Sequence, residues 1–294
     1  MTTLTDQLNQ LKSKVADDFS KTCLEGARRA LEDRENPLRL NFFSTAMRIL
    51  FEHMMDTLAP INSVMRCAWF KPEKEDGKPT RAQRINYAIQ GGLLDSFVAE
   101  RLQINPGPLR KRLLDAVDEC SKQVHAREHT VVVIPSEQET LAEATIAAVK
   151  ALLDVMNSCR AAIVDQIAES LDNVAVDALL TETILEVDEL STHHFIQDLS
   201  VDRVVVDTIG PDNIIYKSSG SIEVILQYGS NSDVRNDIGA EIRQTFPFYC
   251  DIEVSLSDPW NLEDAELRYG VDVSAWRDAM MPDDENRPPD DDEY

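Results

Sequence analysis

Long apolar runs, paired cysteines and the common nucleotide and hydrolase motifs are all missing from this chain of 294 residues. No stretch of about 18 apolar residues occurs, so we expect no membrane-spanning helix. The opening MTTLTDQLNQLKSKV has no apolar core, so we also expect no secretory signal. The five cysteines (Cys23, Cys67, Cys120, Cys159 and Cys250) form no CxxC pair. This argues against a disulfide framework or zinc site and indicates a reducing cytoplasm.

There is no P-loop, no GxGxxG and no GxSxG, the short motifs that bind nucleotide phosphates and dinucleotides or present a nucleophilic serine. We therefore predict no cofactor. Positive charge is scarce as well, because 29 Lys and Arg stand against 53 Asp and Glu, and the formal net charge is −24. A net charge of this sign argues against binding nucleic acid over the whole surface.

The charge is unevenly spread. Residues 66–112 carry ten Lys and Arg against five Asp and Glu, a net charge of +5, whereas residues 113–294 carry eleven against 39, a net charge of −28. A phosphate backbone responds to local potential, because salt screens electric fields within roughly 10 Å. Residues 66–112 are therefore predicted to hold nucleic acid, with Lys71, Arg81 and Arg84 as contacts. The alternative is that these cations face acidic surface elsewhere in the fold.

The hydrophobic pattern predicts an α+β fold, in which an all-helical N-terminal domain precedes a small antiparallel β domain and an acidic disordered tail. Four segments follow from it: an amphipathic N-terminal helix at 1–35, a helical domain at 36–190, the β domain at 191–281 and the tail at 282–294. TRAQ at 80–83 and Ser136 with Glu139 predict capping boxes. Helical spacing predicts one long helix after residue 136 and a further helix at about 174–190.

In the β domain, four short β-branched runs predict four strands: VDRVVVDTI, NIIYKS, SIEVILQYG and FYCDIEVSL. Turns are expected at GPDN and SSG between them. Phe246-Pro247-Phe248 indicates a strand that enters from an edge or bulge, because proline cannot donate a ladder hydrogen bond.

The first candidate site is Arg48 with His53, in RILFEH. This spacing is that of the metal-independent HEPN ribonucleases, in which histidine transfers protons and arginine stabilises the phosphate. Those enzymes usually carry a polar residue after the arginine, where this chain has Ile49. Five steps along a helix also place the two side chains about 140° apart. The pattern puts His53 on one apolar face with Leu38 and Phe42, where a buried, hydrogen-bonded histidine is the alternative.

The second candidate is KQVHAREH, a cationic cluster at a helix end with Lys122, His125, Arg127 and His129. It can contact phosphate and supply an imidazole that titrates near neutral pH. Alternatively, its charges stabilise the helix dipole. A third group, Glu186 to His194, can be read as a metal site or as a solvated helix end, and we predict no metal. The polar loop at 227–237 can be interpreted either as a simple turn or as a binding loop, and both alternatives are kept.

Several segments together resemble one family: NPLRLNFFSTAMRILFEHMMDTLAP, WFKPE, PTRAQRINYAIQGGL, SKQVHAREHT, DELSTHH, and QYGSNSDVRND followed by FPF. They are similar to the predicted pPIWI-associating nucleases of bacterial antiviral-defence neighbourhoods. The resemblance covers most of residues 36–256. It implies a cytoplasmic defence-associated nuclease but no tested catalytic residue.

The leading hypothesis is a metal-independent endoribonuclease. In it His53 or His125 transfers protons, Arg48 stabilises the phosphate, and Lys122, Arg127 and the 66–112 region bind RNA in preference to DNA. Because HEPN-type sites are usually completed across a dimer, a homodimer is expected. The alternative is a non-catalytic adaptor, sensor or DNA mimic, whose acidic C-terminal half binds a basic protein of a defence system. It gains support if His53 is fully buried and His125 pairs with an acid.

Overall fold

The computed structural model describes residues 3–125, 127–128, 131–181 and 184–280, so the tail predicted at 282–294 lies outside the described residues. The predicted α+β class is confirmed, because a helical N-terminal part is followed by a four-stranded antiparallel sheet. The chain divides into two compact units, Met1–Asp165 with Ile209–Asn213, and Gln166–Thr208 with Ile214–Tyr294. The long helix α8 (Pro135–Thr181) contributes to both. Along the described chain, no helix is long and apolar enough to cross a membrane.

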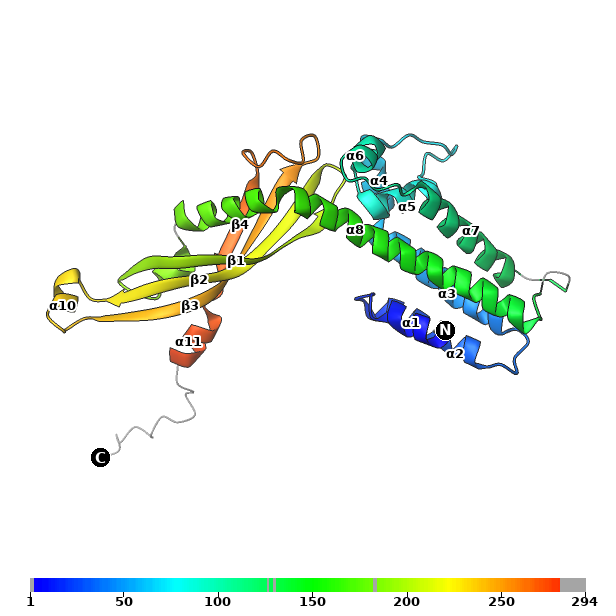
Figure 1. The fold of residues 1–294 in the computed structure, drawn as a ribbon, viewed down its shortest axis with the longest axis horizontal. Helices are drawn as coiled ribbons and strands as arrows, with labels where there is room; N and C mark the ends of the chain where they lie inside the picture. The colour runs from blue at the N-terminus through cyan, green and yellow to red at the C-terminus, as the bar shows by residue number, and fades with distance from the viewer. Residues whose placement is uncertain (1–2, 126, 129–130, 182–183, 281–294) are drawn as a thin grey trace, which may run out of the picture. The chain divides into compact units, whose positions relative to one another are not determined.

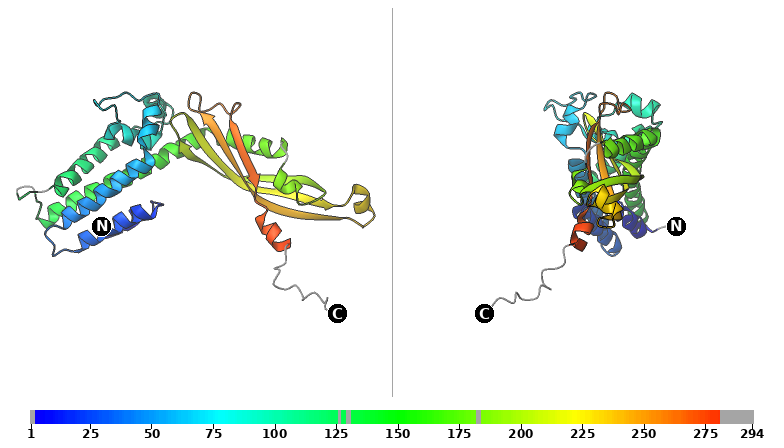
Figure 2. Two further views of the ribbon diagram at one scale, coloured as in Figure 1. Left: turned by 180° about the vertical axis from the view of Figure 1, so that it is seen from behind. Right: turned by 90° about the vertical axis from the view of Figure 1, so that its left-hand side faces the viewer.

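The first unit is built from helices (Figures 1 and 2). They are α1 (Leu4–Lys12), α2 (Asp18–Glu32), α3 (Arg39–Leu58), α4 (Ile61–Arg66), α5 (Arg81–Gln90), α6 (Asp95–Glu100), α7 (Gly107–Val124) and the first part of α8. One hydrophobic core runs through all of them except α6, from Leu8 on α1 to Met156 on α8. Burying apolar area contributes roughly 25 cal/mol per Å², so this shared core holds α3, which carries the first candidate site, against α2 and α7.

The N-terminal helix expected over 1–35 is divided in two, because the chain turns between Lys12 and Asp18. Asp17 ends this turn as the N-cap of α2, and its side chain accepts a 2.7 Å hydrogen bond from the Ser20 N–H. Its short carboxylate satisfies a backbone donor that would otherwise be unpaired at the helix start. The two helices then pack against each other through Leu8, Leu11 and Leu24.

The capping box predicted at the start of α5 is confirmed. Gln83 N–H donates to Thr80 Oγ1 at 3.3 Å, and Thr80 N–H donates to Gln83 Oε1 at 2.9 Å. The second predicted box is wrong, because α8 already begins at Pro135 and Ser136 lies inside it. Glu139 forms an ion pair with Arg39 of α3 instead.

The apolar face predicted for α3 is wrong in part. The buried face is formed by a neighbouring set of residues: Leu40, Phe43, Ser44, Met47, Leu50, Phe51, Met54 and Met55. Leu38, Phe42 and Ile49 are exposed instead. The helix carries apolar residues on more than one side, so spacing alone could not identify the side that packs.

The second unit contains a sheet with the strand order β1-β2-β3-β4, formed by β1 (His193–Ile209), β2 (Asn213–Tyr228), β3 (Ala240–Ser255) and β4 (Glu266–Val271). The last part of α8 lies along one face of this sheet (Figures 1 and 2). Leu179 of α8 and Val187 of α9 (Leu185–Asp188) pack there against Val224, Phe246 and Val271. The short helices α10 (Asn231–Arg235) and α11 (Ser274–Met280) complete the unit.

Two of the strand predictions are wrong. The runs NIIYKS and SIEVILQYG form the single strand β2, without the turn expected at SSG. Gly220 instead permits a close approach of strands, because a Cβ there would lie 1.9 Å from the Ser200 carbonyl oxygen. The fourth strand is β4, a segment that the sequence did not indicate. The further helix predicted at 174–190 is also wrong, since α8 continues to Thr181 and only α9 follows.

Pro247 lies within β3, which is an inner strand of the sheet. The pairing of β3 with β4 ends at Phe248 opposite Val271. The Pro247 carbonyl accepts a 2.8 Å hydrogen bond from Asp272, one residue beyond β4. In an antiparallel sheet a residue's N–H and C=O point to the same side. The missing donor of proline therefore faces Asp272, so the lost bond falls at the very end of the β3–β4 ladder.

Candidate active site

Arg48 of α3 and His125 of α7 come together on the first unit although 77 residues separate them. Arg48 Nη1 lies 3.2 Å from His125 Nε2. A guanidinium is always protonated and only donates. This contact is a hydrogen bond when the imidazole nitrogen accepts, with the ring proton on Nδ1. The result is a cation beside an imidazole nitrogen, a pair suited to binding a phosphate and exchanging a proton.

The seam between α3 and α7 positions this pair. Asn41 Nδ2 donates a 2.6 Å hydrogen bond to the Gln123 carbonyl in the last turn of α7. His125 follows directly as the C-cap, and its N–H donates to the Ser121 carbonyl at 3.2 Å. The imidazole is exposed, whereas the Arg48 side chain is only 28% exposed. Arg48 therefore has little freedom, and the histidine faces solvent, where a substrate can reach it.

Glu52 is a third member that the sequence reasoning missed. Its Oε1 accepts a 3.1 Å hydrogen bond from Arg48 Nε. The two residues are one helical turn apart, a spacing that brings side chains together on a helix surface. This i,i+4 spacing in RILFE was the available signal. The carboxylate holds the guanidinium from one side and leaves Nη1 directed at His125.

His53 is engaged elsewhere. Its Nε2 lies 3.0 Å from Asp17 Oδ1, and its ring centroid lies 4.7 Å from that of Phe19. Its side chain is 31% exposed, so it is half-buried rather than enclosed in the core. Among the contacts of the described residues, none joins His53 to Arg48. The five-residue spacing therefore does not bring these two side chains together in one protomer.

Asp17 shows the electrostatic consequence of this clamp. Hydrogen bonds from the Ser20 backbone and side chain, together with the nearby His53, lower the pKa of the Asp17 carboxyl to about 2. An ionised carboxylate at pH 7 can both cap α2 and pair with His53. The contact joins the start of α2 to the middle of α3, which indicates a structural task for His53.

Most cations predicted to bind substrate are paired with acids. Arg81 lies 3.2 Å from Asp118, and Lys122 lies 3.1 Å from Glu119. Arg84 is only 17% exposed, and it binds both Asp56, at 2.8 Å, and the Ala59 carbonyl, at 3.0 Å. The alternative reading of the basic region, in which its charges face acids within the fold, thus applies to Arg81 and Arg84.

Other cations remain accessible. Lys71, Lys78, Lys111 and Arg112 are exposed, and no acid in the described part of the chain pairs with them. Arg127 is exposed as well, whereas His129 lies outside the described residues. Lys111, Arg112 and Lys122 all belong to α7, the helix that ends at His125. The exposed cations of α7 thus stand at its start, and Asp115, Asp118 and Glu119 separate them from Lys122 near the candidate pair.

The remaining candidates form no comparable site. His194 Nδ1 lies 3.6 Å from Asp188, and Arg277 pairs with Glu189 at 2.8 Å. Within the described residues, no group of three or more His, Cys, Asp or Glu side chains is placed to hold a metal ion. The 227–237 loop contains α10, which begins with a capping box between Ser230 and Asp233. All five cysteines are buried and unpaired.

Two family models match the chain, and both are described as predicted pPIWI-associating nuclease. One covers residues 12–149 and the other residues 156–277. The chain belongs to this family. The first match contains Arg48, His53 and His125, and the second contains the sheet. Searches of curated proteins and of solved structures find no match.

Proposed function

We propose that this pPIWI-associating nuclease cleaves single-stranded RNA without a metal ion, at a site formed by Arg48 and His125. The observation that supports the proposal is the 3.2 Å contact between Arg48 Nη1 and His125 Nε2. Family membership supports the reaction class. RNA is preferred over DNA because a reaction that uses only a histidine and an arginine needs the 2′-hydroxyl as its nucleophile.

In the proposed reaction a phosphodiester displaces the Arg48–His125 contact. His125 Nε2 accepts the proton of the 2′-hydroxyl, and the 2′-oxygen attacks the adjacent phosphorus. The bond from phosphorus to the 5′-oxygen breaks, and this oxygen takes up a proton. The products are a 2′,3′-cyclic phosphate and a 5′-hydroxyl. Arg48 stabilises the charge that develops on the phosphoryl oxygens, and Glu52 keeps its guanidinium in place.

Substrate contacts are proposed for Lys122 and Arg127 beside His125, and for Lys71, Arg81 and Arg84 in the basic region. Lys71 is the best supported of the last three because it has no acidic partner among the described residues. To contact phosphate, Arg81 must exchange Asp118, and Arg84 must exchange Asp56. Such contacts attract RNA without reading its sequence.

A homodimer is also part of the proposal. Phe42 and Ile49 are 56% and 43% exposed, and with Leu38 they lie on the exposed side of α3, next to Arg48. Large apolar side chains grouped on a surface are typical of an interface. A second copy packed on this side of α3 would bring two Arg48–His125 pairs near each other and supply a second imidazole to protonate the leaving oxygen.

The cellular setting follows from the family description and the cysteines. Five buried, unpaired thiols fit a reducing cytoplasm. Association with a pPIWI protein in antiviral defence is proposed from the family name alone.

The test is cleavage of labelled single-stranded RNA and DNA, with and without EDTA, by wild type and by folded Arg48→Ala, His125→Ala and His53→Ala variants. We expect EDTA-resistant RNA cleavage that falls about 100-fold or more in Arg48→Ala and His125→Ala. His53→Ala should lose stability and keep most activity. Arg29→Ala, which removes an exposed ion-pair arginine of α2, is the matched control. Cleavage that survives His125→Ala would contradict the assignment.

The alternative function is a non-catalytic adaptor whose acidic C-terminal half binds a basic protein. The net charge of −28 over residues 113–294 favours it. The two features expected of it are not seen, since His53 is half-buried and the described contact of His125 is with an arginine. A pull-down with a basic partner and no cleavage by the wild type would support this function.

A further inference from the structure

A partly open cavity of about 360 Å³, with both polar and apolar walls, lies in the first unit, away from Arg48 and His125. It is bordered by α1, the end of α2, the start of α3 and the beginning of α8. Its lining includes Thr3, Leu31, Arg34, Arg39, Glu139 and Glu143. Cavities of this size hold small organic ligands.

Arg39, which the sequence did not mark, is the decisive residue of this cavity. Its side chain is only 5% exposed. Its Nε donates a 2.6 Å hydrogen bond to Gln138 Oε1, while its Nη2 stands 3.6 Å from Glu139, too far for a hydrogen bond. A guanidinium has five N–H donors, so most of them have no hydrogen-bond partner among the described residues. A buried guanidinium with unpaired donors lowers the stability of the fold unless another group binds it.

Gln138 holds the arginine in place. The Gln138 side chain is itself buried, and its Nε2 donates to the carbonyls of Pro37, at 3.1 Å, and Val132, at 2.8 Å. These bonds fix the amide so that its oxygen faces Arg39. The guanidinium is thus fixed through Nε, with Nη1 left for the cavity and Nη2 directed both at the cavity and at Glu139, 3.6 Å away. A fork of this kind matches the oxygens of a phosphate or carboxylate.

The charged side chains of the cavity lining are separated by sign. Arg34, in the α2–α3 connection, is exposed and forms no described ion pair, so two cations lie on the same stretch of chain. Glu139 and Glu143 come from α8, one turn apart. A dianionic group satisfies two arginines better than a single carboxylate does. The carboxylates of α8 in turn require hydrogen-bond donors on the remainder of the ligand.

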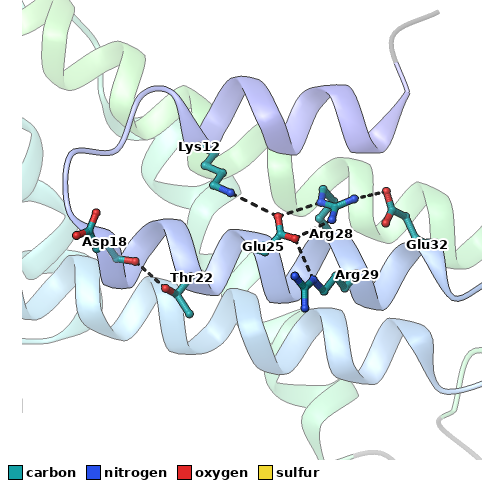
Figure 3. A network of polar contacts seen from close by, with 7 residues as sticks. All are labelled: Lys12, Asp18, Thr22, Glu25, Arg28, Arg29 and Glu32. Atoms are coloured by element: carbon teal, nitrogen blue, oxygen red, sulfur yellow. Dashed lines mark hydrogen bonds and ion pairs between the residues drawn. The ribbon is translucent and has the colours of Figure 1, made fainter.

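The wall formed by α1 and α2 is braced by an ion-pair network (Figure 3). Glu25 accepts hydrogen bonds from Arg28, at 2.7 Å, from Arg29, at 2.9 Å, and from Lys12 of α1, at 3.4 Å. Arg28 continues to Glu32, which also lines the cavity. The bonds from Arg28 and Arg29 hold the pKa of Glu25 well below its usual range. Lys12 joins α1 to this network, and the buried Leu8, Leu11 and Leu24 pack α1 on α2, so the cavity exists before a ligand arrives.

We propose that this cavity binds a small phosphate monoester whose organic part carries hydroxyl or amino donors. The phosphate lies between Arg39 and Arg34, and Glu139 and Glu143 accept hydrogen bonds from the donors. The site is separate from the proposed nuclease site, so it offers a place for a small molecule to act on the first unit.

Isothermal titration of the full chain with adenosine 5′-monophosphate, inorganic phosphate and adenosine tests the proposal. We expect saturable binding of the monophosphate at one site per chain, with weaker binding of phosphate or adenosine alone. Arg39→Lys keeps the charge and loses the fork, and Arg34→Ala removes the exposed cation. Each should weaken binding roughly tenfold to a hundredfold.

Three controls keep this outcome distinct from the nuclease proposal. Arg34 is exposed, so Arg34→Ala remains informative if Arg39→Lys does not fold. Lys21→Ala removes an exposed cation elsewhere on α2 and should bind normally. Arg48→Ala should also bind normally, because the cavity does not include Arg48. No binding by wild type, unchanged binding in Arg34→Ala, or loss of binding in Arg48→Ala would overturn the proposal.

Discussion

At the scale of single residues, Asp17 binds two parts of the first unit with one carboxylate. It caps α2 and contacts His53 of α3. Its folded pKa of about 2 lies below the ordinary 3.8. A lowered carboxylate pKa adds stability at pH values above the ordinary pKa, and that stability is lost as the pH falls toward the folded pKa.

The prediction is that wild type loses stability more steeply than Asp17→Asn as the pH falls from 3.8 to about 2. Asparagine retains a side-chain oxygen that can cap the helix but does not titrate. Urea midpoints of both proteins across this range are the measurement. Parallel curves would show that the Asp17 clamp does not contribute to folding.

Glu52 is predicted to position Arg48 without touching the substrate. Glu52→Gln keeps the shape of the side chain and weakens the ion pair. RNA cleavage should fall by about tenfold, less than in Arg48→Ala, because the arginine remains but is held less firmly. The loss should appear in kcat more than in KM. An unchanged kcat would show that Glu52 does not position Arg48 for the reaction.

At the scale of elements, the end of α5 is a tight junction. Gly91 has φ +60°, and a Cβ there would lie 2.2 Å from the Ile209 carbonyl oxygen. The next N–H, that of Gly92, donates to the Gly210 carbonyl at 2.9 Å. The turn at 209–213 therefore requires glycine at 91 for space as well as for backbone conformation.

Gly77 provides a matched comparison, because its φ is +69° but a Cβ there would meet nothing within 4 Å. Both alanine variants carry the strain of a left-handed backbone. Gly91→Ala should cost a further 1 to 3 kcal/mol or so of unfolding free energy, because the turn must move. Chemical denaturation measures the difference. Equal losses would indicate that the turn does not pack on α5.

The elements also show where sequence reasoning ended. Helix positions were predictable where caps acted locally, as at Thr80 and Gln83. The continuity of β2 through SSG was not predictable, because Gly220 makes room for the approach of β1, which is a long-range contact. The same limit explains the sites. Arg48 and His125 were each identifiable, but their pairing depends on the packing of α3 on α7. Arg39 had no local signal, since Gln138 is 99 residues away.

At the scale of the whole molecule, the exposed apolar side of α3 predicts self-association. Phe42→Asp and Ile49→Lys place charges in the proposed interface and should convert a dimer to a monomer. Leu185→Asp is the control, because Leu185 is 67% exposed on α9 of the other unit. Light scattering after gel filtration gives the mass. A wild-type protein that is monomeric at micromolar concentration would contradict the proposed homodimer.

Arg48 and His125 are proposed to cleave RNA through its own 2′-hydroxyl, without a metal ion. The most direct measurement incubates wild type in EDTA with one labelled strand as RNA and with the same strand fully 2′-deoxy. We predict that the RNA alone is cut and that its fragments end in a 2′,3′-cyclic phosphate. Cleavage of the deoxy strand, or loss of all cleavage in EDTA, would contradict a site built from Arg48 and His125.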